Sequence, residues 1–228
     1  MLLSLDDADL YPEDLDLYNS NQWLNSNCMN FSLRALEDED WGVTVGSKAD
    51  VYLMDPCVLS YLRFQVESDE ERKDYCDGNA IFSKTWILAP VSNAPNLFES
   101  GSHWSLLVYH VPSNKAVHFD SMNDSNKGTA DSVLNVICQT LGRSVGFTLF
   151  SPRHGIRQSD GFSCGIFTIL FAQFVSHSIA QDAAFFEREF LALSDDKCYL
   201  RDMKVQISDE DVVKYLEKIK SFIKMKMK

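Results

Sequence analysis

The chain has 228 residues, 45% of them hydrophobic and 12% aromatic, which is long and apolar enough for one large domain with a substantial core. Its formal net charge of -12 argues against nucleic acid or an anionic membrane as the main partner, and it suits a partner with a basic face or tail. The first twenty residues contain acidic side chains but no Lys or Arg, the opposite of a secretory or mitochondrial signal.

The N-terminal half predicts two helices. Residues 1–20 are expected to form an extended acidic segment of a single domain that fills 1–228. From Asn21 to about Glu37, apolar residues spaced by three and four predict an amphipathic helix. Asp55-Pro56 has the form of an N-cap and the first residue of a second helix. The charged stretch 67–78 is expected to be an exposed connection.

The rest of the chain predicts a sheet with helices around it. Strands are expected at 85–88, 104–111, 116–120 and 147–150. The second of these is apolar on both faces, as a central strand is, and the turn at 112–114 would pair it antiparallel with the third. Helices are expected at 129–141, at 163–179 and from Ser208 onward. The pattern is typical of an α+β fold with a mostly antiparallel sheet.

No segment is predicted to cross a membrane, because the most apolar stretch, 165–175, is too short to span a bilayer. We therefore expect a monomeric protein of the cytoplasm or nucleus. Its six cysteines are expected to be mostly free thiols. Since none forms a C-x-x-C pair and no His/Cys cluster has zinc-like spacing, we expect neither a metal nor a cofactor.

Three residues fall at positions where chemistry is favoured. His103 precedes the predicted central strand, Asp120 ends its neighbour, and Cys164 begins the most apolar helix. Antiparallel strands joined by a tight turn would bring the imidazole and the carboxylate together at one edge of the sheet. The helix N-terminus and a nearby imidazolium would favour the thiolate of Cys164, which is the nucleophilic form.

Asp120 would orient the imidazole of His103, and Gln158, six residues before Cys164, could add its amide to the Cys164 N–H in an oxyanion hole. Taken singly, each of these residue types is more often structural than catalytic. Their joint placement at two strand ends and a helix start favours a cysteine-nucleophile hydrolase.

At this point the sequence resembles a known family. The segments 103–109, 120–121 and 158–165 read HWSLLVY, DS and QSDGFSCG. They are similar to the ubiquitin-like-protein-specific cysteine proteases, which include the SUMO (sentrin) proteases and the deneddylases. The family has the order His, Asp, Gln, Cys, whereas papain-like enzymes begin with Cys. Trp23-Leu24-Asn25 also resembles a family motif, and the likeness runs from about Trp23 to Ile179.

The resemblance implies a papain-like α+β fold and cleavage after the diglycine tail of a ubiquitin-like modifier. It also implies that Trp23 and Trp104 clamp this tail, because flat aromatic walls admit glycine and exclude larger side chains. For Trp23, a place in the core is the alternative. The polar loop 93–102 ahead of His103 is expected to order over the bound modifier.

Within the family, the catalytic segment and the stretch 120–142 look closest to the deneddylase branch, so we expect the partner to be a neddylation-type modifier and its conjugates. Two residues depart from the usual pattern. Ser26 stands where the family usually has Asp, which removes an acidic contact that would affect modifier specificity. Ser163 also replaces a usual Asp, but it keeps its backbone N–H.

Three alternatives remain open at this stage. A SUMO-specific protease would use the same residues on another modifier. An acetyltransferase could use the same His–acid–Cys set, although no basic pocket for a phosphorylated cofactor is evident. A module that binds a modifier without cutting it would not need all four catalytic residue types. The targets, the balance of precursor processing against deconjugation, and the regulation do not follow from the sequence.

Overall fold

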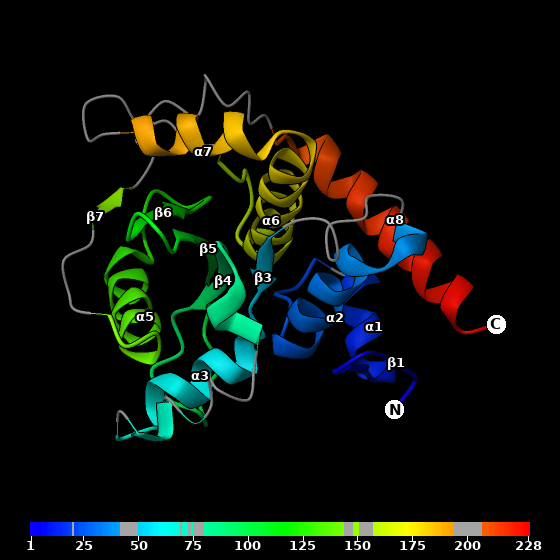
Figure 1. The fold of residues 1–228 in the computed structure, drawn as a ribbon. Helices are drawn as coiled ribbons and strands as arrows, with labels where there is room; N and C mark the ends of the chain where they lie inside the picture. The colour runs from blue at the N-terminus through cyan, green and yellow to red at the C-terminus, as the bar shows by residue number, and fades with distance from the viewer. Residues whose placement is uncertain are drawn as a thin grey trace.

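The computed structural model describes residues 1–19, 21–41, 50–68, 70–72, 74, 80–143, 148–150, 157–193 and 207–228. Within them, a five-stranded sheet lies between two groups of helices (Figure 1). The strands lie in the order β3 (Val51–Leu53), β4 (Trp86–Ser92), β5 (Trp104–His110), β6 (Lys115–Phe119) and β7 (Thr148–Phe150). The long ladders of β5 with β4 and β6 are antiparallel, and the short edge strands β3 and β7 run parallel to their neighbours. The expected α+β fold is confirmed.

β5 is the centre of the sheet. All seven of its residues are buried, because both of its faces are covered by helices. The turn between β5 and β6 is tight, with Asn114 in the left-handed region at φ 56°. This turn fixes the antiparallel register that sets Leu106 opposite Phe119. The first residues of β5 and the last residues of β6 therefore lie side by side. These strand ends are the edge of the sheet at which His103 and Asp120 lie.

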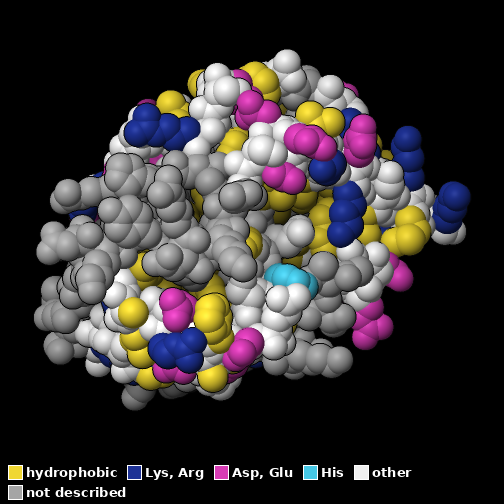
Figure 2. All heavy atoms as spheres, turned by 90° about the horizontal axis from the view of Figure 1, so that it is seen from above, with side chains coloured by type: hydrophobic (Ala, Val, Ile, Leu, Met, Phe, Trp, Pro, Cys, Tyr) yellow, Lys and Arg dark blue, Asp and Glu magenta, His cyan; other side chains and the backbone are white. Residues whose placement is uncertain are grey.

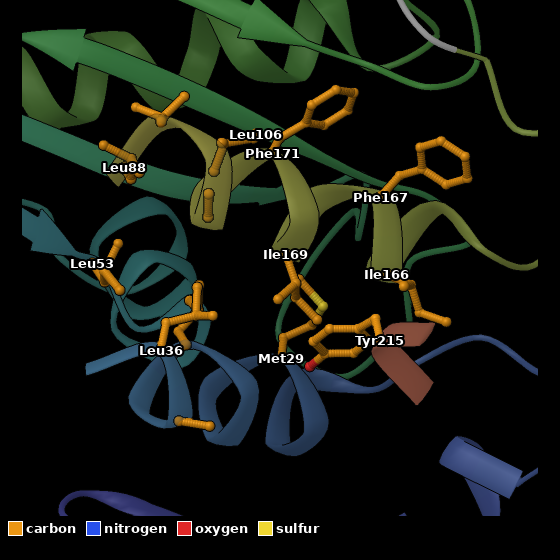
Figure 3. Close-up of a cluster of buried hydrophobic side chains, with 14 of the residues drawn as sticks. Met29, Leu36, Leu53, Leu88, Leu106, Ile166, Phe167, Ile169, Phe171 and Tyr215 are labelled. Carbon is orange, nitrogen blue, oxygen red and sulfur yellow. The ribbon is translucent and has the colours of Figure 1, made fainter. Parts of the chain in front are cut away.

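On one side of the sheet lie α6 (Cys164–Gln181), which packs directly on β5, and α2 (Ser26–Glu37), α7 (Ala183–Ala192) and α8 (Asp209–Lys226), which pack around α6. Eleven of the eighteen residues of α6 are buried, because it lies between the sheet and α2. Figure 3 shows Ile169 of α6 pointing toward Met29 of α2, and both side chains are almost fully buried. This burial fixes where α6 begins, which is the position of Cys164.

The opposite face is covered by α3 (Pro56–Phe64) and α5 (Lys127–Thr140). The apolar residues of these helices pack on side chains such as Leu107, Tyr109 and Ala116, which alternate with those facing α6. As predicted, Asp55 caps α3, and its carboxylate accepts the Cys57 N–H at 2.6 Å.

The prediction of an extended segment at residues 1–20 is wrong. The described residues 1–19 form a hairpin of β1 (Leu3–Leu5) and β2 (Ala8–Leu10), followed by α1 (Pro12–Asn19). Apolar residues alternate with the acidic ones, so that Ala8 and Leu10 are buried while Asp9 between them is exposed. The prediction followed the charge and missed this alternation.

Other boundaries differ in smaller ways. α2 begins at Ser26 and not near Asn21, because the side chain of Asn25 caps it by accepting the Cys28 N–H. β4 continues to Ser92, beyond the predicted end at 88. The strand β3, the helix α7 and two short 3-10 turns, η1 (Glu39–Trp41) and η2 (Ala80–Ser83), were not predicted. The stretch 67–78 lies partly outside the described residues.

The length and composition of α6 alone would allow it to cross a membrane, but 61% of it is buried inside the protein, where it serves as the core helix. Charge is unevenly spread. The N-terminal hairpin and α1 carry acidic side chains, whereas α8 ends with lysines. Figure 2 shows dark-blue basic side chains at the right-hand end of the molecule, where α8 ends in Figure 1.

Candidate active site

His103 and Asp120 meet at the edge of the sheet. His103 immediately precedes β5 and Asp120 immediately follows β6, so antiparallel pairing places them side by side. His103 Nε2 lies 2.7 Å from Asp120 Oδ1. The imidazole is 5% exposed and the carboxylate is fully buried. The structure therefore brings together the two residues that the strand ends predicted.

The chain that follows β6 wraps around the Asp120 carboxylate. Oδ1 also accepts the Met122 N–H at 2.7 Å, and Oδ2 accepts the Asn126 N–H at 2.9 Å. Burial alone would raise the pKa of Asp120, but the hydrogen bonds from His103 and from these two N–H groups hold it below its usual value. The buried carboxylate is therefore kept ionised.

The ionised carboxylate makes His103 a strong base. Burial alone would lower the pKa of His103, but hydrogen bonding to Asp120 and the interaction with the Cys164 sulfur outweigh it and raise the pKa to about 9. The nearby His118 shows the opposite case, because burial lowers its pKa to about 4. At neutral pH, His103 is therefore an imidazolium and His118 is a neutral ring.

The second nitrogen of the His103 ring is left free by Asp120, and the Cys164 sulfur, which lies 3.9 Å from the Phe162 carbonyl oxygen, is in the vicinity of this ring. Nε2 of His103 is taken by Asp120, whereas Nδ1 is buried and forms no hydrogen bond with any described residue. The sulfur of Cys164 is close enough to raise the pKa of the ring. Cys164 is itself 1% exposed and is the first residue of α6, beside the unpaired N–H groups of the helix start. Nδ1 is thus the nitrogen available to exchange a proton with the sulfur.

Asp160 shapes the turn that delivers Cys164. Its Oδ1 accepts the N–H groups of Phe162 at 2.9 Å and Ser163 at 2.8 Å, and its Oδ2 accepts the Ser163 hydroxyl at 2.5 Å. The serine that departs from the family pattern thus binds an aspartate three residues earlier. This contact fixes the backbone directly before Cys164.

Hydrogen bonds hold Gln158 next to the His103–Asp120 pair. Its Oε1 accepts the Ser121 hydroxyl at 2.6 Å, and its backbone N–H donates to the Ser121 carbonyl at 3.2 Å. Its Nε2 donates to the Asp160 carbonyl at 2.8 Å, which uses one of the two amide hydrogens. Gln158 is therefore held between the residue that follows Asp120 and the turn before Cys164.

The two tryptophans are fixed by hydrogen bonds from their indole N–H groups. Trp23 donates to the Gly161 carbonyl at 2.7 Å, and Trp104 donates to the Leu24 carbonyl at 2.8 Å. Trp104 is buried, but Trp23 is 51% exposed, so the alternative of a core role for Trp23 is wrong. Both rings line a pocket of about 470 Å³. The two tryptophans that the sequence singled out thus line one pocket, next to the turn of residues 160–163 that precedes Cys164.

The loop 93–102 forms the rim of this pocket. Its base is closed by the Asn93 side chain, which accepts the N–H groups of Ser102 at 2.7 Å and of His103 at 3.0 Å. There is no room for a side chain at Gly101, so the loop must turn there on a glycine. At its tip, Phe98 is 93% exposed. A loop whose base is fixed next to His103 thus carries an exposed aromatic ring at its tip.

The sequence did not reveal Ser121, Asn126 or Asp160 as parts of the site. Ser121 holds Gln158, Asn126 holds Asp120, and Asp160 holds the turn before Cys164. Ser121 and Asp160 lie inside the segments that resemble the family, but short polar residues after a strand or before a helix are usually turn formers, so no role in the site was predicted for them.

The site has the residue types that nucleophilic hydrolysis requires. A cysteine at a helix start lies in the vicinity of an imidazole that an ionised carboxylate orients, which is the arrangement used in covalent catalysis. Among the described residues, no cluster of three or more His, Cys, Asp or Glu side chains could hold a metal ion.

Comparison with known proteins agrees with this chemistry. Residues 22–215 match the Ulp1 protease family, C-terminal catalytic domain. The chain belongs to the Ulp1 protease family. It is therefore a cysteine peptidase of this family, as its resemblance indicated.

Curated relatives of this Ulp1-family chain cover about three quarters of it. It is 27% identical over 176 residues to the probable sentrin-specific protease 8 of Dictyostelium discoideum, covering 74% of this chain and 72% of the relative. It is also 27% identical over 179 residues to NEDD8-specific protease 1 of Arabidopsis thaliana, covering 76% and 74%. Human sentrin-specific protease 8 is 24% identical over 169 residues, covering 74% and 78%.

Solved structures share the fold. The SUMO protease Ulp1 with its catalytic cysteine oxidised to a sulfinic acid superposes with a TM-score of 0.64 at 13% identity, covering 99% of this chain and 88% of that one. The C-terminal Ulp1 protease domain in complex with Smt3, the yeast ortholog of SUMO, gives a TM-score of 0.55 at 17% identity, covering 80% and 87%. The papain-like Ulp1 protease fold expected from the sequence is confirmed.

Proposed function

We propose that this Ulp1-family protease is a deneddylase. It cleaves after the C-terminal diglycine of a neddylation-type modifier, both in the modifier precursor and in conjugates where the tail is linked to a lysine side chain. The relative named as a NEDD8-specific protease supports this choice, as does the resemblance of the catalytic segment to the deneddylase branch. Residues 1–228 act as a single catalytic domain.

The observation that carries the catalytic assignment is the arrangement at His103. Asp120 lies 2.7 Å from one ring nitrogen, the other ring nitrogen has no partner among the described residues, and the Cys164 sulfur is close enough to raise the pKa of the ring. Hydrogen bonding to Asp120 fixes the tautomer and orientation of the ring. We therefore assign Cys164 as the nucleophile, His103 as the acid and base, and Asp120 as the residue that orients His103.

In the first half of the reaction, the thiolate of Cys164 attacks the carbonyl carbon of the terminal glycine. The oxyanion that forms accepts hydrogen bonds from the Cys164 N–H and from the second amide hydrogen of Gln158. The C–N bond then breaks, and His103 gives its proton to the leaving amine. The product is a thioester between the modifier and Cys164, together with the released lysine or precursor peptide.

In the second half, water replaces the amine. The now neutral His103 takes a proton from the water as it attacks the thioester carbonyl. The C–S bond breaks, the modifier leaves with a free carboxylate, and the thiolate–imidazolium pair is restored. Asp120 stays ionised throughout, because three N–H donors stabilise its charge.

The pocket beside the site suits a narrow tail. Trp23 and Trp104 wall it with flat rings that are fixed by their own hydrogen bonds, so a glycine backbone can pass where a bulky side chain cannot. The loop 93–102 presents Phe98 at its tip, and we assign this exposed ring to contact with the modifier.

A SUMO-type protease is the second candidate, because relatives carry the name sentrin-specific protease. The choice between the two modifiers depends in part on Ser26. This residue is the first of α2 and lines the same pocket as the tryptophans, so the carboxylate that the family usually has there would face the entering tail.

The test uses modifiers that carry a C-terminal fluorogenic amide. NEDD8, SUMO and ubiquitin forms are incubated in parallel with the wild-type protein, with Cys164→Ala, and with Cys138→Ala, which removes a buried thiol of α5. We expect fastest cleavage of the NEDD8 form, full activity of Cys138→Ala and none of Cys164→Ala. Preferred cleavage of SUMO would replace the deneddylase proposal, and activity of Cys164→Ala would end the assignment of the nucleophile.

A further inference from the structure

Asn126 occupies the N-cap position of α5 but does not cap that helix. An asparagine at this position usually turns its side-chain oxygen to a backbone N–H of its own helix. Here the side chain is turned away and is 1% exposed. The Asn126 side chain therefore does not stabilise the start of α5, and its contacts lie elsewhere.

The Asn126 amide nitrogen points at the start of β5. It lies 3.3 Å from the carbonyl oxygen of His103, 3.1 Å from that of Val91 and 3.0 Å from Ser105 Oγ. Only a donor is stable against two carbonyl oxygens, so the orientation of the amide is not interchangeable. Its Oδ1 is buried and has no partner among the described residues, which shows that the site is built around the nitrogen.

The backbone of the same residue holds the other half of the pair. The Asn126 N–H donates to Asp120 Oδ2 at 2.9 Å. The turn that separates the two residues passes through Asn123 and Asp124, both in the left-handed region at φ 56° and 59°. One residue thus contacts the backbone of His103 through its side chain and the carboxylate of Asp120 through its main chain.

A second buried contact supports this arrangement. Ser105 Oγ, which Asn126 contacts, also lies 2.9 Å from Nε2 of His118, a fully buried ring on β6. The hydroxyl therefore links β5 to β6 directly behind the His103–Asp120 pair. A network of this kind resists a shift of one strand end against the other.

We propose that Asn126 is a positioning residue that sets the distance and angle between the His103 ring and the Asp120 carboxylate. It touches neither substrate nor sulfur and acts only through these two residues. The inference rests on the catalytic roles proposed for His103 and Asp120. Losing the Asn126 amide would leave the His103 backbone free to shift, and a displacement of about 1 Å at a catalytic group can cost about 10²-fold in rate.

The test compares Asn126→Ala and Asn126→Asp with the wild-type enzyme on its best modifier substrate, at a temperature where thermal melts show every variant to be folded. We expect kcat to fall by about 10²-fold while KM stays within about threefold, since the tail pocket is untouched. For Asn126→Ala we also expect the alkaline limb of the pH–rate profile to move to lower pH, because a looser contact with Asp120 holds the His103 proton less firmly.

The matched control is Asn30→Ala. Asn30 is a buried asparagine of α2 whose amide donates to Asp55 at 3.1 Å, so its loss also removes a buried hydrogen bond. The control should lower the melting temperature and leave both kcat and the pH profile unchanged. A normal kcat in both Asn126 variants, a loss that Asn30→Ala reproduces, or a loss in Asn126→Ala without a shift of the alkaline limb would each overturn the proposal.

If the Asn126 variants do not fold, the variant Ser105→Ala tests the same network. It keeps both carbonyl acceptors and removes only the hydroxyl between Asn126 and His118. We expect kcat to fall by about three- to tenfold, with the same shift of the alkaline limb. An unchanged kcat would refute the role of this network. An inactive wild-type protein, or an active Cys164→Ala, would instead point to failure of the proposed function itself.

Discussion

The edge of the sheet and the rim of the pocket are built in opposite ways. At the edge, Asp120 is fully buried and accepts hydrogen bonds from three N–H groups, and His103 is 5% exposed. At the rim, Trp23 is 51% and Phe98 is 93% exposed. The edge is covered by the core on both faces, whereas the rim is fixed mainly at its base.

This difference separates chemistry from recognition. A buried, heavily hydrogen-bonded pair keeps its geometry and its charge whether or not substrate is present, as preorganised catalysis requires. An exposed aromatic rim offers apolar surface that only a bound partner can cover. Changes at the edge should therefore lower kcat, and changes at the rim should raise KM.

The largest effect is expected for Asp120→Asn. The neutral amide cannot stabilise the imidazolium, and loss of the orienting carboxylate in comparable triads lowers kcat by about 10⁴-fold. The active form carries a proton on His103, so wild-type activity should persist below the pKa of about 9 and fall as the pH rises through it. In the variant, the alkaline limb should move toward about 6.5, the ordinary value for histidine.

The control for Asp120→Asn is Asp131→Asn, which removes a surface carboxylate of α5 that pairs with Lys127. Steady-state kinetics across pH should show no change for it. An Asp120→Asn enzyme with a normal kcat, whose activity still falls with a midpoint near pH 9, would refute the role of the buried carboxylate.

A smaller loss is expected for Gln158→Ala. Removing one oxyanion donor typically costs about 10²–10³-fold in kcat. Ser121→Ala, which frees the Gln158 side chain without deleting it, should cost less. Single-turnover measurements of acylation would check both. If Gln158→Ala acylates at the wild-type rate, the oxyanion must be stabilised by other donors.

At the rim, Phe98→Ala should raise KM for the intact modifier by about tenfold, which is the loss of one exposed aromatic contact. The kcat at saturation should stay within about threefold of wild type, since no catalytic group is touched. A short peptide that ends in diglycine makes no contact with the loop tip and serves as the matched substrate. Should kcat fall for both substrates, the loop would belong to the catalytic edge.

The smallest effect is expected for Ser26→Asp, which restores the acidic residue usual in the family. One exposed ion pair contributes little, so the ratio of kcat/KM between NEDD8 and SUMO substrates should change by about two- to fivefold. Measuring both substrates with one enzyme preparation gives this ratio directly. An unchanged ratio would mean that position 26 does not select the modifier.

The sequence revealed the parts of the site that depend on strand and helix ends. His103, Asp120 and Cys164 each lie within one residue of an element boundary, and the alternation of apolar residues placed those boundaries closely enough. The tryptophans and Gln158 came from the family resemblance or from spacing. The structure places Trp23 and Gln158 beside the turn before Cys164, and Trp104 lines the same pocket as Trp23.

The rest depends on contacts that no local pattern encodes. The bond from the Asn126 amide to the His103 carbonyl joins residues of different elements through a main-chain atom, which has no residue-specific signature. The late start of α2 depends on Asn25, whose own amide is held by the buried Asp14 of α1. The N-terminal hairpin was missed because its acidic residues hid the alternation of the apolar ones.

The central claim is that Asp120 and Cys164 keep His103 protonated at neutral pH. An NMR titration of the histidine ring signals tests it, with assignments from single His→Gln variants. The account predicts a midpoint of about 9 for His103 and about 4 for the buried His118 in the same spectra. A His103 midpoint at or below about 6.5, the ordinary value for histidine, would contradict it.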